Sequence, residues 1–407
     1  MTQTVFSTVT LPCGVHIKNR TLKSAMSEGL GASNYQPSKE LNMLYHAFAW
    51  GGCGLVVTGN VMVNRNALGE PGNVVIDEAS DMDALTAWAT QATQNDTACF
   101  VQLNHPGKQS PRFVSKETYA PSAIPLSGGY KAAFRTPLEM TQAMIEDTIH
   151  RFAIAALKVK DAGFTGVQIH AAHGYLISQF LSPLHNQRTD HYGGTLDNRA
   201  RFLMEIVKAI RSHVGPPFPI GVKMNVDDFK EGGFSAQESL KVMQWLDEAG
   251  IDFIEISGGS YEQPVMTEGR EGEPIYFLSF AKKIKETIQA PLVVTGGFRT
   301  LESMHRAIAE GHCDFVGLAR PFALNPSLIK HLEQGQAFPK MVRLTTGFKR
   351  LDQKLGAALG LSYYGWQLKR IAQEKPPKIT KNAYRVLLHT VYHQGFKALK
   401  RRRYKDV

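Results

Sequence analysis

The segment Gly166-Val-Gln-Ile-His170-Ala-Ala-His173-Gly-Tyr175 places a short, mostly apolar run directly before two histidines and a tyrosine. A run of this kind, without strict alternation of apolar and polar residues, is typical of a parallel strand that is buried on both faces. In folds with such strands, the chemistry sits at the carboxyl ends of the strands. The segment therefore predicts a buried strand that ends at a functional site.

Eight β-rich runs of this kind occur in the first 335 residues, with helical patterns between them. The helical segments include Ser80–Asn95, Thr141–Ala162 and Ser235–Ala249, the last of which starts with the capping-box pattern Ser235-Ala-Gln-Glu238 and stops before Gly250. Repeated strand–helix units predict a (β/α)8 TIM barrel, with a doubly wound open sheet as the alternative. The predicted strands are Thr21–Met26, Gly54–Asn60, Ala98–Leu103, Gly166–His170, Pro219–Asn225, Phe253–Ser257, Leu292–Gly296 and Phe315–Ala319.

Two segments lie outside this repeat. Phe6–Lys18, with the turn residues Pro12-Cys-Gly14, predicts a short hairpin that closes the barrel floor. The loop His105–Pro137 is long and rich in Pro, Ser and Gly, and loops of that length in a compact domain are usually functional lids.

The carboxyl ends of the predicted strands collect polar, small or charged side chains. A barrel with a purely structural role would have no reason to gather two His, a Tyr, a Lys, a Gln and an Arg there. The end residues are Ala25, Met26 and Ser27, then Thr58, Gly59 and Asn60, then Gln102 and His105, then His170, His173 and Tyr175, then Lys223, Gly258 and Gly259, Gly296 and Gly297, and finally Ala319 and Arg320.

The last two strand ends have the composition of a phosphate site. The backbone N–H groups of Gly296 and Gly297 can approach a phosphate closely, and Arg320 adds a bidentate positive group, although two glycines also suit a plain tight turn. Lys223 would be a lysine inside the barrel, where a charge needs an anionic partner. That partner is either the electron-rich N1 and O2 edge of a flavin or a carboxylate in a salt bridge.

The residues after the fourth strand suit carbonyl chemistry. His170 and His173 could both donate hydrogen bonds to one oxygen and so stabilise a developing enolate, and Tyr175 could deliver a proton. A zinc site built on His-x-x-His is an alternative, but no third ligand stands out. Structural histidines of the core are the other alternative.

The charge of the chain is divided unevenly. The chain has 407 residues and a formal net charge of +10, yet residues 336–407 carry 17 Lys and Arg against three acidic residues, while the other 335 residues carry 29 basic and 33 acidic groups. Two parts are therefore predicted, a barrel over residues 1–335 and a basic helical extension over residues 336–407. The end of the extension has an amphipathic pattern, with Tyr384, Leu387, Leu388, Val391, Phe396 and Leu399 at helical spacing before Lys400–Arg403. It would pack on the barrel or on a second subunit of a homo-oligomer, lie on an anionic membrane surface, or, least favoured, bind nucleic acid.

Cysteine usage and hydropathy indicate an ordinary intracellular protein. Cys13, Cys53, Cys99 and Cys313 lie far apart and form no Cys-x-x-Cys pair, which argues against a zinc knuckle or an iron–sulfur cluster, and Cys53 and Cys99 are predicted to be buried thiols. No signal peptide and no run long enough for a membrane span is evident, so a cytoplasmic location is expected.

At these motifs the sequence resembles the old yellow enzyme family of NADH:flavin oxidoreductases, over about residues 4–340. It is most similar to the branch with the barrel of 2,4-dienoyl-CoA reductase and the bacterial NADH oxidases, but the cysteine cluster and second nucleotide-binding domain of that larger enzyme are absent here. Electrons are therefore expected directly from NADH or NADPH. The matching stretches are His170–Pro183, Asn186–Gly194, Asn198–Phe202, Gln102–Gly107, Gly296–Phe298 and Gly317–Arg320.

The resemblance implies FMN as the cofactor and an α,β-unsaturated carbonyl compound as the substrate. Hydride would pass from NAD(P)H to flavin N5 and then to the substrate Cβ, with a proton from Tyr175 to Cα, while His170 and His173 would hold the carbonyl oxygen or the nicotinamide amide. Lys223 occupies a position at which many members of the family have Arg. Ser27 occupies a position near flavin O4 at which other members have Cys or Thr. The redox potential of the flavin is therefore expected to differ from that of those members. By resemblance, Ala25, Met26, Ser27, Gly59, Gln102 and Lys223 would contact the flavin ring, and Gly296, Gly297, Ala319 and Arg320 its phosphate.

Three other functions are alternatives for this sequence. A flavin barrel could instead oxidise amines or alcohols, although the two histidines and Tyr175 favour a carbonyl acceptor. An RNA-modifying flavin enzyme such as a dihydrouridine synthase would use a catalytic cysteine after the third strand, and His105–Pro137 contains none. A non-catalytic interaction protein would bind no flavin.

Overall fold

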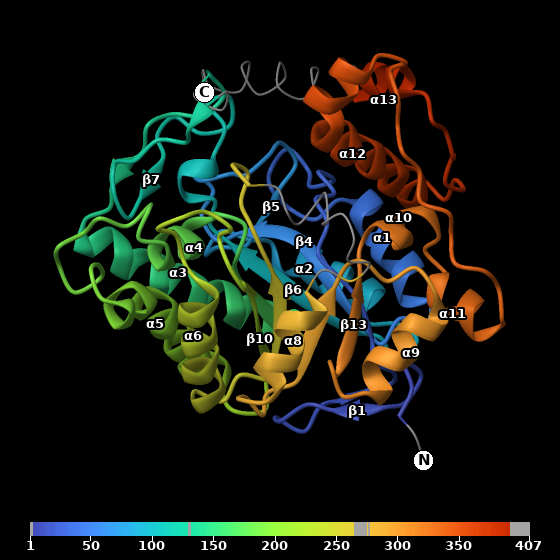
Figure 1. Cartoon of the computed structure of the whole chain (residues 1–407), viewed down its shortest axis with the longest axis horizontal. Coiled ribbons are helices and arrows are strands. Elements are labelled where there is room, and N and C mark those ends of the chain that lie inside the picture. Colours follow the sequence, from blue (N-terminus) through green and yellow to red (C-terminus); the bar gives the residue numbers. More distant parts are fainter. Residues whose placement is uncertain (1–2, 129–131, 264–274, 276, 391–407) are drawn as a thin grey trace.

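Eight parallel strands close into a barrel, because the first of them, β3, pairs with both β13 and β4. The computed structural model describes residues 3–128, 132–263, 275 and 277–390 (Figure 1). The closed barrel confirms the predicted (β/α)8 fold, and the open-sheet alternative is wrong. The barrel strands are β3 (Thr21–Lys23), β4 (Leu55–Met62), β6 (Ala98–Asn104), β9 (Gly166–Ala171), β10 (Ile220–Asn225), β11 (Phe253–Ser257), β12 (Leu292–Thr295) and β13 (Phe315–Leu318).

Most predicted strand bounds agree with the observed ones to within one residue, and larger differences occur at the ends of two strands. β3 ends at Lys23 instead of Met26, and the chain after it leaves the ladder with a last hydrogen bond from Ser24 N to the Leu318 carbonyl. β4 continues to Met62, where the short strand β5 (Val74–Val75) pairs with it outside the barrel. The residue at which a strand ends depends on its pairing with neighbouring strands, and local composition does not encode this pairing.

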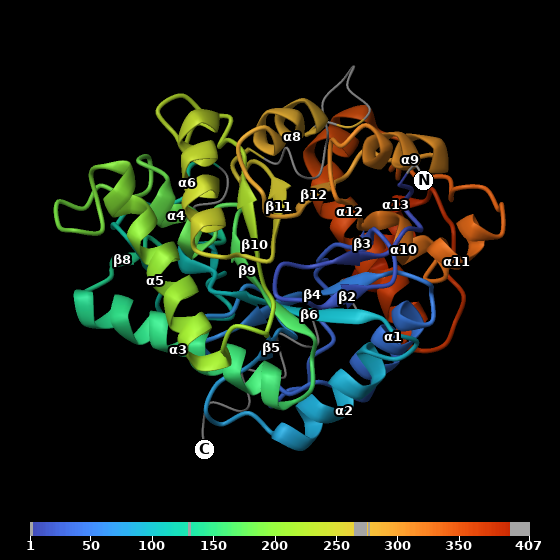
Figure 2. The ribbon, with the colours of Figure 1, turned by 90° about the horizontal axis from the view of Figure 1, so that it is seen from below.

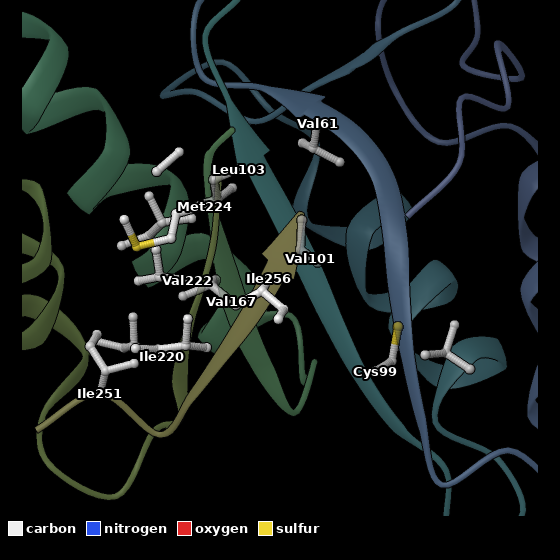
Figure 3. Close-up of a cluster of buried hydrophobic side chains, with 14 of the residues drawn as sticks. Val61, Cys99, Val101, Leu103, Val167, Ile220, Val222, Met224, Ile251 and Ile256 are labelled. Carbon is white, nitrogen blue, oxygen red and sulfur yellow. The ribbon is translucent and has the colours of Figure 1, made fainter. Parts of the chain in front are cut away.

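A ring of helices surrounds the barrel (Figure 2). The capping box at Ser235 is present, and Gly250 has the left-handed φ of 74° that suits a residue just beyond a helix end. Apolar side chains fill the space between helices and strands, and Figure 3 shows part of this layer, with Val101, Val167 and Val222. The helices are α1 (Lys39–Ala49), α2 (Met82–Ala92), α3 (Gln142–Asp161), α4 (Leu176–Leu181), α5 (Leu196–Val214), α6 (Ala236–Glu248), α8 (Leu278–Lys285), α9 (Leu301–Ala309), α10 (Arg320–Leu324) and α11 (Leu328–Glu333).

The predicted hairpin is present and covers the barrel floor. Its strands β1 (Val9–Thr10) and β2 (His16–Ile17) pair antiparallel at the end of the molecule opposite α12 (Figure 1). Leu11 and Ile17 of the hairpin join an apolar cluster with Leu22, Leu55, Val57, Ala98, Phe100, Phe253, Val293 and Phe315 from the barrel interior. The floor is therefore closed by apolar packing. Cys53 and Cys99 are fully buried free thiols, as predicted.

The loop after β6 and the C-terminal extension lie on the other end of the molecule, beyond the strand ends. The loop contains a 3₁₀ turn, Gly107–Gln109, and the short parallel strands β7 (Tyr119–Ala120) and β8 (Leu138–Glu139). The extension forms α12 (Lys349–Ala372) and α13 (Ala383–Thr390), and α12 packs against α1 and α10 (Figure 1).

In the structure, α12 packs on the barrel. Leu368, Ile371 and Ala372 of this helix are buried in the main apolar core, and the Gln373 amide donates to Glu40 of α1. Of the predicted amphipathic helix, only the part up to Thr390 is described, as α13, and Val391–Leu399 and Lys400–Arg403 lie outside the described residues. None of the described helices is long and apolar enough to span a bilayer.

The close fit between large side chains and glycines in the barrel floor leads to a first prediction. Phe253 of β11 lies over Gly221 of β10, so a methyl group at position 221 would clash with the Phe253 ring. We expect Gly221→Ala to lower the free energy of unfolding by about 1–3 kcal/mol, because overpacking forces side chains off their rotamers. Urea unfolding followed by tryptophan fluorescence measures this change.

Gly360→Ala is the matched control, because Gly360 lies in α12 and a methyl group there meets no atom within 4 Å. That substitution should leave stability unchanged or raise it by about 0.5–1 kcal/mol. Equal stability of Gly221→Ala and the wild type would show that the floor is loosely packed.

Candidate active site

His170 lies at the end of β9 as a buried, neutral hydrogen-bond donor. Its Nδ1 accepts a hydrogen bond of 3.2 Å from the backbone N–H of Ala172, which leaves the proton of the neutral ring on Nε2. Burial lowers the pKa of His170 well below its usual value, and the nearby His173 and Lys223 lower it further. At neutral pH the ring therefore presents one N–H group without a positive charge.

His173 is held on three sides in a left-handed backbone conformation. Its φ of 61° is unusual for a non-glycine residue, its backbone N–H donates to Asn225 Oδ1 at 3.1 Å, and its carbonyl accepts from the Gln109 amide at 3.0 Å. The ring Nε2 lies 2.6 Å from the Ser257 hydroxyl. Burial lowers the pKa of His173 well below its usual value, with Lys223 as a second cause.

The two rings are neighbours, as the sequence predicted, but they are not equivalent. Their centroids lie 5.0 Å apart and nearly perpendicular. Because Ser257 occupies Nε2 of His173, only Nδ1 of that ring remains to face a ligand, whereas His170 offers Nε2. Donation by both rings to one oxygen remains a prediction, and it would use Nε2 of His170 and Nδ1 of His173.

Tyr175 packs edge-on against His170 with its hydroxyl held by two side chains. The two ring centroids are 4.8 Å apart, and the Tyr175 hydroxyl lies 3.0 Å from the Tyr261 hydroxyl and 3.4 Å from Asn60 Nδ2. Burial raises the pKa of Tyr175 well above its usual value, and Tyr261 raises it further. The phenol therefore stays protonated over the neutral range and can serve as a proton donor.

Sequence reasoning missed Tyr261, which lies four residues beyond the end of β11. Its ring also faces Phe134 of the long loop after β6, with centroids 6.2 Å apart. In the same region Glu262 accepts a hydrogen bond of 2.8 Å from Ser127 N, and Ser260 forms a bridge with His173. The loop after β6 thus reaches the site through the loop after β11, and a lid function for it remains a prediction. Proximity to a strand end was the signal that could have found Tyr261.

A hydrogen-bonded layer of polar side chains crosses the barrel directly below the histidines. Lys223 Nζ lies 2.9 Å from Glu255 Oε1, and Gln168 donates to the other carboxylate oxygen at 2.8 Å. Gln102 donates to Gln168 at 2.7 Å, and Thr295 donates to Glu255 at 2.7 Å. Of the two partners that the sequence allowed for Lys223, the structure supplies the carboxylate.

Glu255 is fully buried, yet it remains ionised. Burial would raise its pKa, but the Lys223 charge and the hydrogen bonds from Gln168, Lys223 and Thr295 together hold the pKa below its usual value. The positive charge of Lys223 is therefore neutralised by a fixed negative charge beneath the site. A further contact of Lys223 or Gln102 with a flavin remains a prediction.

Gly59 is fixed by a second buried cluster, between the barrel and α1. Its N–H donates to Glu28 Oε1 and lies equally close to the Tyr45 hydroxyl, at 3.0 Å each, and Tyr45 also donates to Glu28. A methyl group at position 59 would clash with the Glu28 carboxylate and the Met26 carbonyl. Glycine is thus required here by close packing, and its N–H already has partners in the protein.

The other residues predicted near the flavin ring line the end of β3. Ala25 and Met26 are partly buried, Ala25 against the floor cluster and Met26 against the main core, and Ser27 is exposed.

The predicted phosphate residues lie on the opposite side of the barrel from His170, because β13 follows β9 by four strands in the ring. Gly296 and Gly297 have φ values of 96° and 86°, which glycine adopts without strain, and a methyl group on Gly296 would meet only open space. Ala319 caps α10, whose first residue is Arg320. Positive charge and accessible backbone at this point fit a phosphate, and the span across the barrel mouth fits an elongated cofactor.

A metal centre has no support in this region. Within the described part of the chain, no group of three or more His, Cys, Asp and Glu side chains is arranged to bind a metal ion.

Comparison with known proteins agrees with this geometry. The model of the NADH:flavin oxidoreductase / NADH oxidase family matches residues 5–338. The chain is 39% identical over 352 residues to the NADH-dependent flavin oxidoreductase iliE of Hypocrea jecorina (strain QM6a), covering 79% of this chain and 87% of the relative. It is 31% identical over 358 residues to the NADPH dehydrogenase of Bacillus cytotoxicus, covering 86% and 95%.

The solved old yellow enzyme homologue from Zymomonas mobilis has the same fold, with a TM-score of 0.72 at 23% identity over 83% of this chain and 95% of that one. Fold and site define a flavin-dependent barrel oxidoreductase. The chain belongs to the NADH:flavin oxidoreductase / NADH oxidase family. It is an NAD(P)H:flavin oxidoreductase, and its cofactor is FMN.

The ion pair beneath the site generates a second prediction. Glu255→Gln leaves the Lys223 charge buried without its counter-ion, so we expect a loss of about 3–5 kcal/mol in the free energy of unfolding. Lys223→Met should cost a similar amount, and the double variant should cost clearly less than the sum of the two, by at least about 1 kcal/mol. Urea unfolding of the four proteins measures the coupling.

Lys285→Met is the control, because Lys285 forms a partly exposed pair of 2.8 Å with Asp314, and such pairs contribute about 0–1 kcal/mol. Strict additivity of the Lys223 and Glu255 substitutions would mean that the two groups do not stabilise each other.

Proposed function

We propose that this enzyme reduces the C=C bond of an α,β-unsaturated carbonyl compound with electrons from NADH or NADPH. The observation that carries the proposal is the pairing of two kinds of neutral donor at one place. His170 presents an imidazole N–H, and Tyr175 presents a phenol whose ring centroid lies 4.8 Å from that of His170. The imidazole N–H suits a carbonyl oxygen, and the phenol suits a carbon that must receive a proton.

The histidines would bind and polarise the substrate carbonyl. Hydrogen bonds from His170 Nε2 and His173 Nδ1 stabilise the negative charge that develops on the oxygen as the alkene is reduced. Because burial keeps both rings neutral, they donate without adding a charge of their own. FMN, when bound, would supply the hydride chemistry that connects NAD(P)H with the alkene carbon β to the carbonyl.

Tyr175 would protonate the carbon α to the carbonyl. Its raised pKa keeps the proton on the phenol until a strongly basic carbon is present. Tyr261 and Asn60 orient the hydroxyl, at 3.0 Å and 3.4 Å, so the proton is held in a fixed direction. The name of one relative specifies NADH and that of another NADPH, so both are candidate donors.

Oxidation of amines or alcohols is less well supported by the same groups. Such a reaction begins with removal of a proton from the substrate and so needs a base at neutral pH. Here Tyr175 is a protonated phenol with a raised pKa.

The two half-reactions can be separated by stopped-flow absorbance. In anaerobic wild-type protein, NADH or NADPH should bleach the flavin band, and 2-cyclohexenone should restore it. Tyr175→Phe should slow the return with the enone about 10²–10⁴-fold, because it removes a general acid, and leave the bleaching step within about threefold.

Tyr192→Phe provides the control, since Tyr192 is a buried tyrosine whose hydroxyl donates to Glu205 at 2.8 Å. It should change neither step. Bleaching without any return in the wild type would refute the enone as substrate while leaving the flavin enzyme intact, and equal rates of return in Tyr175→Phe and the wild type would remove Tyr175 from its role.

The pH dependence provides an independent check. The pKa values of His170 and His173 lie well below the usual value and that of Tyr175 well above it, so no change between about pH 6 and 9 protonates the rings or ionises the phenol. We therefore expect a constant rate of flavin return with saturating enone across this range. A rate that falls as the pH rises through about 6.5 would mean that a protonated histidine is required instead.

A further inference from the structure

The helix α13 has apolar side chains on two opposite faces. Ala383 and Val386, three residues apart, lie on the inner face and are fully buried, and Val386 packs in one cluster with Leu324 of α10. Tyr384 and Leu388, four residues apart, share the outer face, with 46% and 72% of their surface exposed. The inner face therefore holds the helix on the protein, while the outer face presents a tyrosine and a leucine to the surroundings.

The start of α13 is fixed by hydrogen bonds. Asn382 Oδ1 accepts from the N–H groups of Tyr384 and Arg385, at 2.9 Å and 3.3 Å, which is the usual contact of an N-cap residue. The Ala383 N–H donates to the Thr345 carbonyl at 3.1 Å and so ties the helix to the segment before α12. Because both the start and the inner face are anchored, the helix cannot turn to bury the side chains of its outer face.

Exposed apolar side chains are concentrated in the C-terminal extension. Among the described residues, eight large apolar side chains are exposed, and five of them belong to the stretch 336–390. Apolar surface that is gathered in one part of a protein and bordered by polar residues marks a surface that binds a partner. The five side chains are Phe348, Leu361, Ile379, Tyr384 and Leu388.

The same stretch carries a strong positive charge. Residues 336–390 contain 11 Lys and Arg against two acidic residues, Asp352 and Glu374. Lys381 directly precedes α13 and Arg385 lies on it four residues further on, so basic groups border the outer face. The basic residues of this stretch whose side chains the structure describes as exposed are Lys340, Arg343, Lys375, Lys378, Lys381 and Arg385.

Three kinds of partner could cover such a face, and its charge distinguishes them. In a two-fold dimer, α13 of one copy would meet α13 of the other, which sets basic residues against basic residues. A nucleic acid would bind the basic groups but would gain little from aliphatic side chains such as Leu388 and Ile379. An anionic lipid surface uses both, because its headgroups attract cations and its acyl chains receive apolar side chains.

We propose that the outer face of α13 binds the surface of an anionic membrane. Tyr384 and Leu388 enter the boundary between the headgroups and the acyl chains. Lys381 and Arg385 contact the negatively charged groups of the lipids. Since the extension lies beyond the strand ends, this contact holds the mouth of the barrel near the bilayer (Figure 1).

Co-sedimentation of the full-length, FMN-loaded protein with lipid vesicles tests the proposal. We expect binding to vesicles of phosphatidylcholine that contain about one third phosphatidylserine, and much weaker binding to phosphatidylcholine alone, because each basic residue near an anionic surface strengthens binding about fivefold. Raising the salt concentration from about 0.1 M to about 0.5 M should weaken the binding about tenfold or more, because salt screens this attraction.

Two variants separate the apolar from the electrostatic contribution. Leu388→Gln should raise the Kd for the anionic vesicles about tenfold, because it removes the more exposed of the two apolar side chains. Lys381→Gln combined with Arg385→Gln should raise it about 30-fold. All three side chains are exposed, so thermal unfolding of the variants should match that of the wild type.

Leu138→Gln is the matched control, because Leu138 of β8 is also an exposed leucine but is followed by Glu139 instead of a basic residue. It should bind the vesicles as the wild type does. Equal binding by Leu388→Gln and the wild type would overturn the proposal, as would a wild type that does not bind anionic vesicles.

The other partners give distinct results. A dimer in sedimentation equilibrium that Leu388→Gln dissociates, without vesicle binding, would assign the outer face to a second copy and overturn the proposal. Binding to single-stranded RNA without vesicle binding would overturn it as well. The vesicles are tested without an enone, so failure of the proposed reduction leaves this result unaffected.

Discussion

The buried ion pair between Lys223 and Glu255 is the interaction on which the mouth of this barrel depends. Side chains that point into the barrel repeat every second residue along each strand, so three successive positions form a floor, a middle layer and a mouth. On β11 these are Phe253, Glu255 and Ser257. The ion pair fills the middle layer, and its hydrogen bonds to Gln168 and Thr295 tie four strands together beneath the site.

Each layer fixes the one above it. Phe100 and Phe253 fill the floor because β9 and β10 have glycines at Gly166 and Gly221, where any larger side chain would clash. Two residues further along, the polar layer is buried, and the Lys223 charge and three hydrogen bonds to Glu255 let this carboxylate remain ionised inside the barrel. Another two residues along β9 lead to His170, which the register between β9 and β10 pairs with Lys223.

The sequence predicted those features of the fold and the site that depend on the local pattern of residues. Apolar runs located all eight strands, and strand ends located His170 and Tyr175, because period and position are encoded near each residue. The carboxylate partner of Lys223 was left as one of two options, since Glu255 sits on another strand and only register brings them together. Tyr261 and Ser257 were missed for the same reason, as their contacts are made by chain segments more than 80 residues from His173 and Tyr175.

The charges of the site are separated in a way that suits its chemistry. The end near β12 and β13 carries the guanidinium groups of Arg299 and Arg320, and burial together with the charge of Arg320 lowers the pKa of Arg299. The end near β9 gathers donors that burial keeps neutral, and Lys223 beneath them is paired with Glu255. A free cation beneath the histidines would add a second attraction for any anion, and a phosphate could then bind at either end. Pairing Lys223 with Glu255 neutralises this charge within the barrel, which agrees with the prediction that the phosphate binds at the end near β12 and β13.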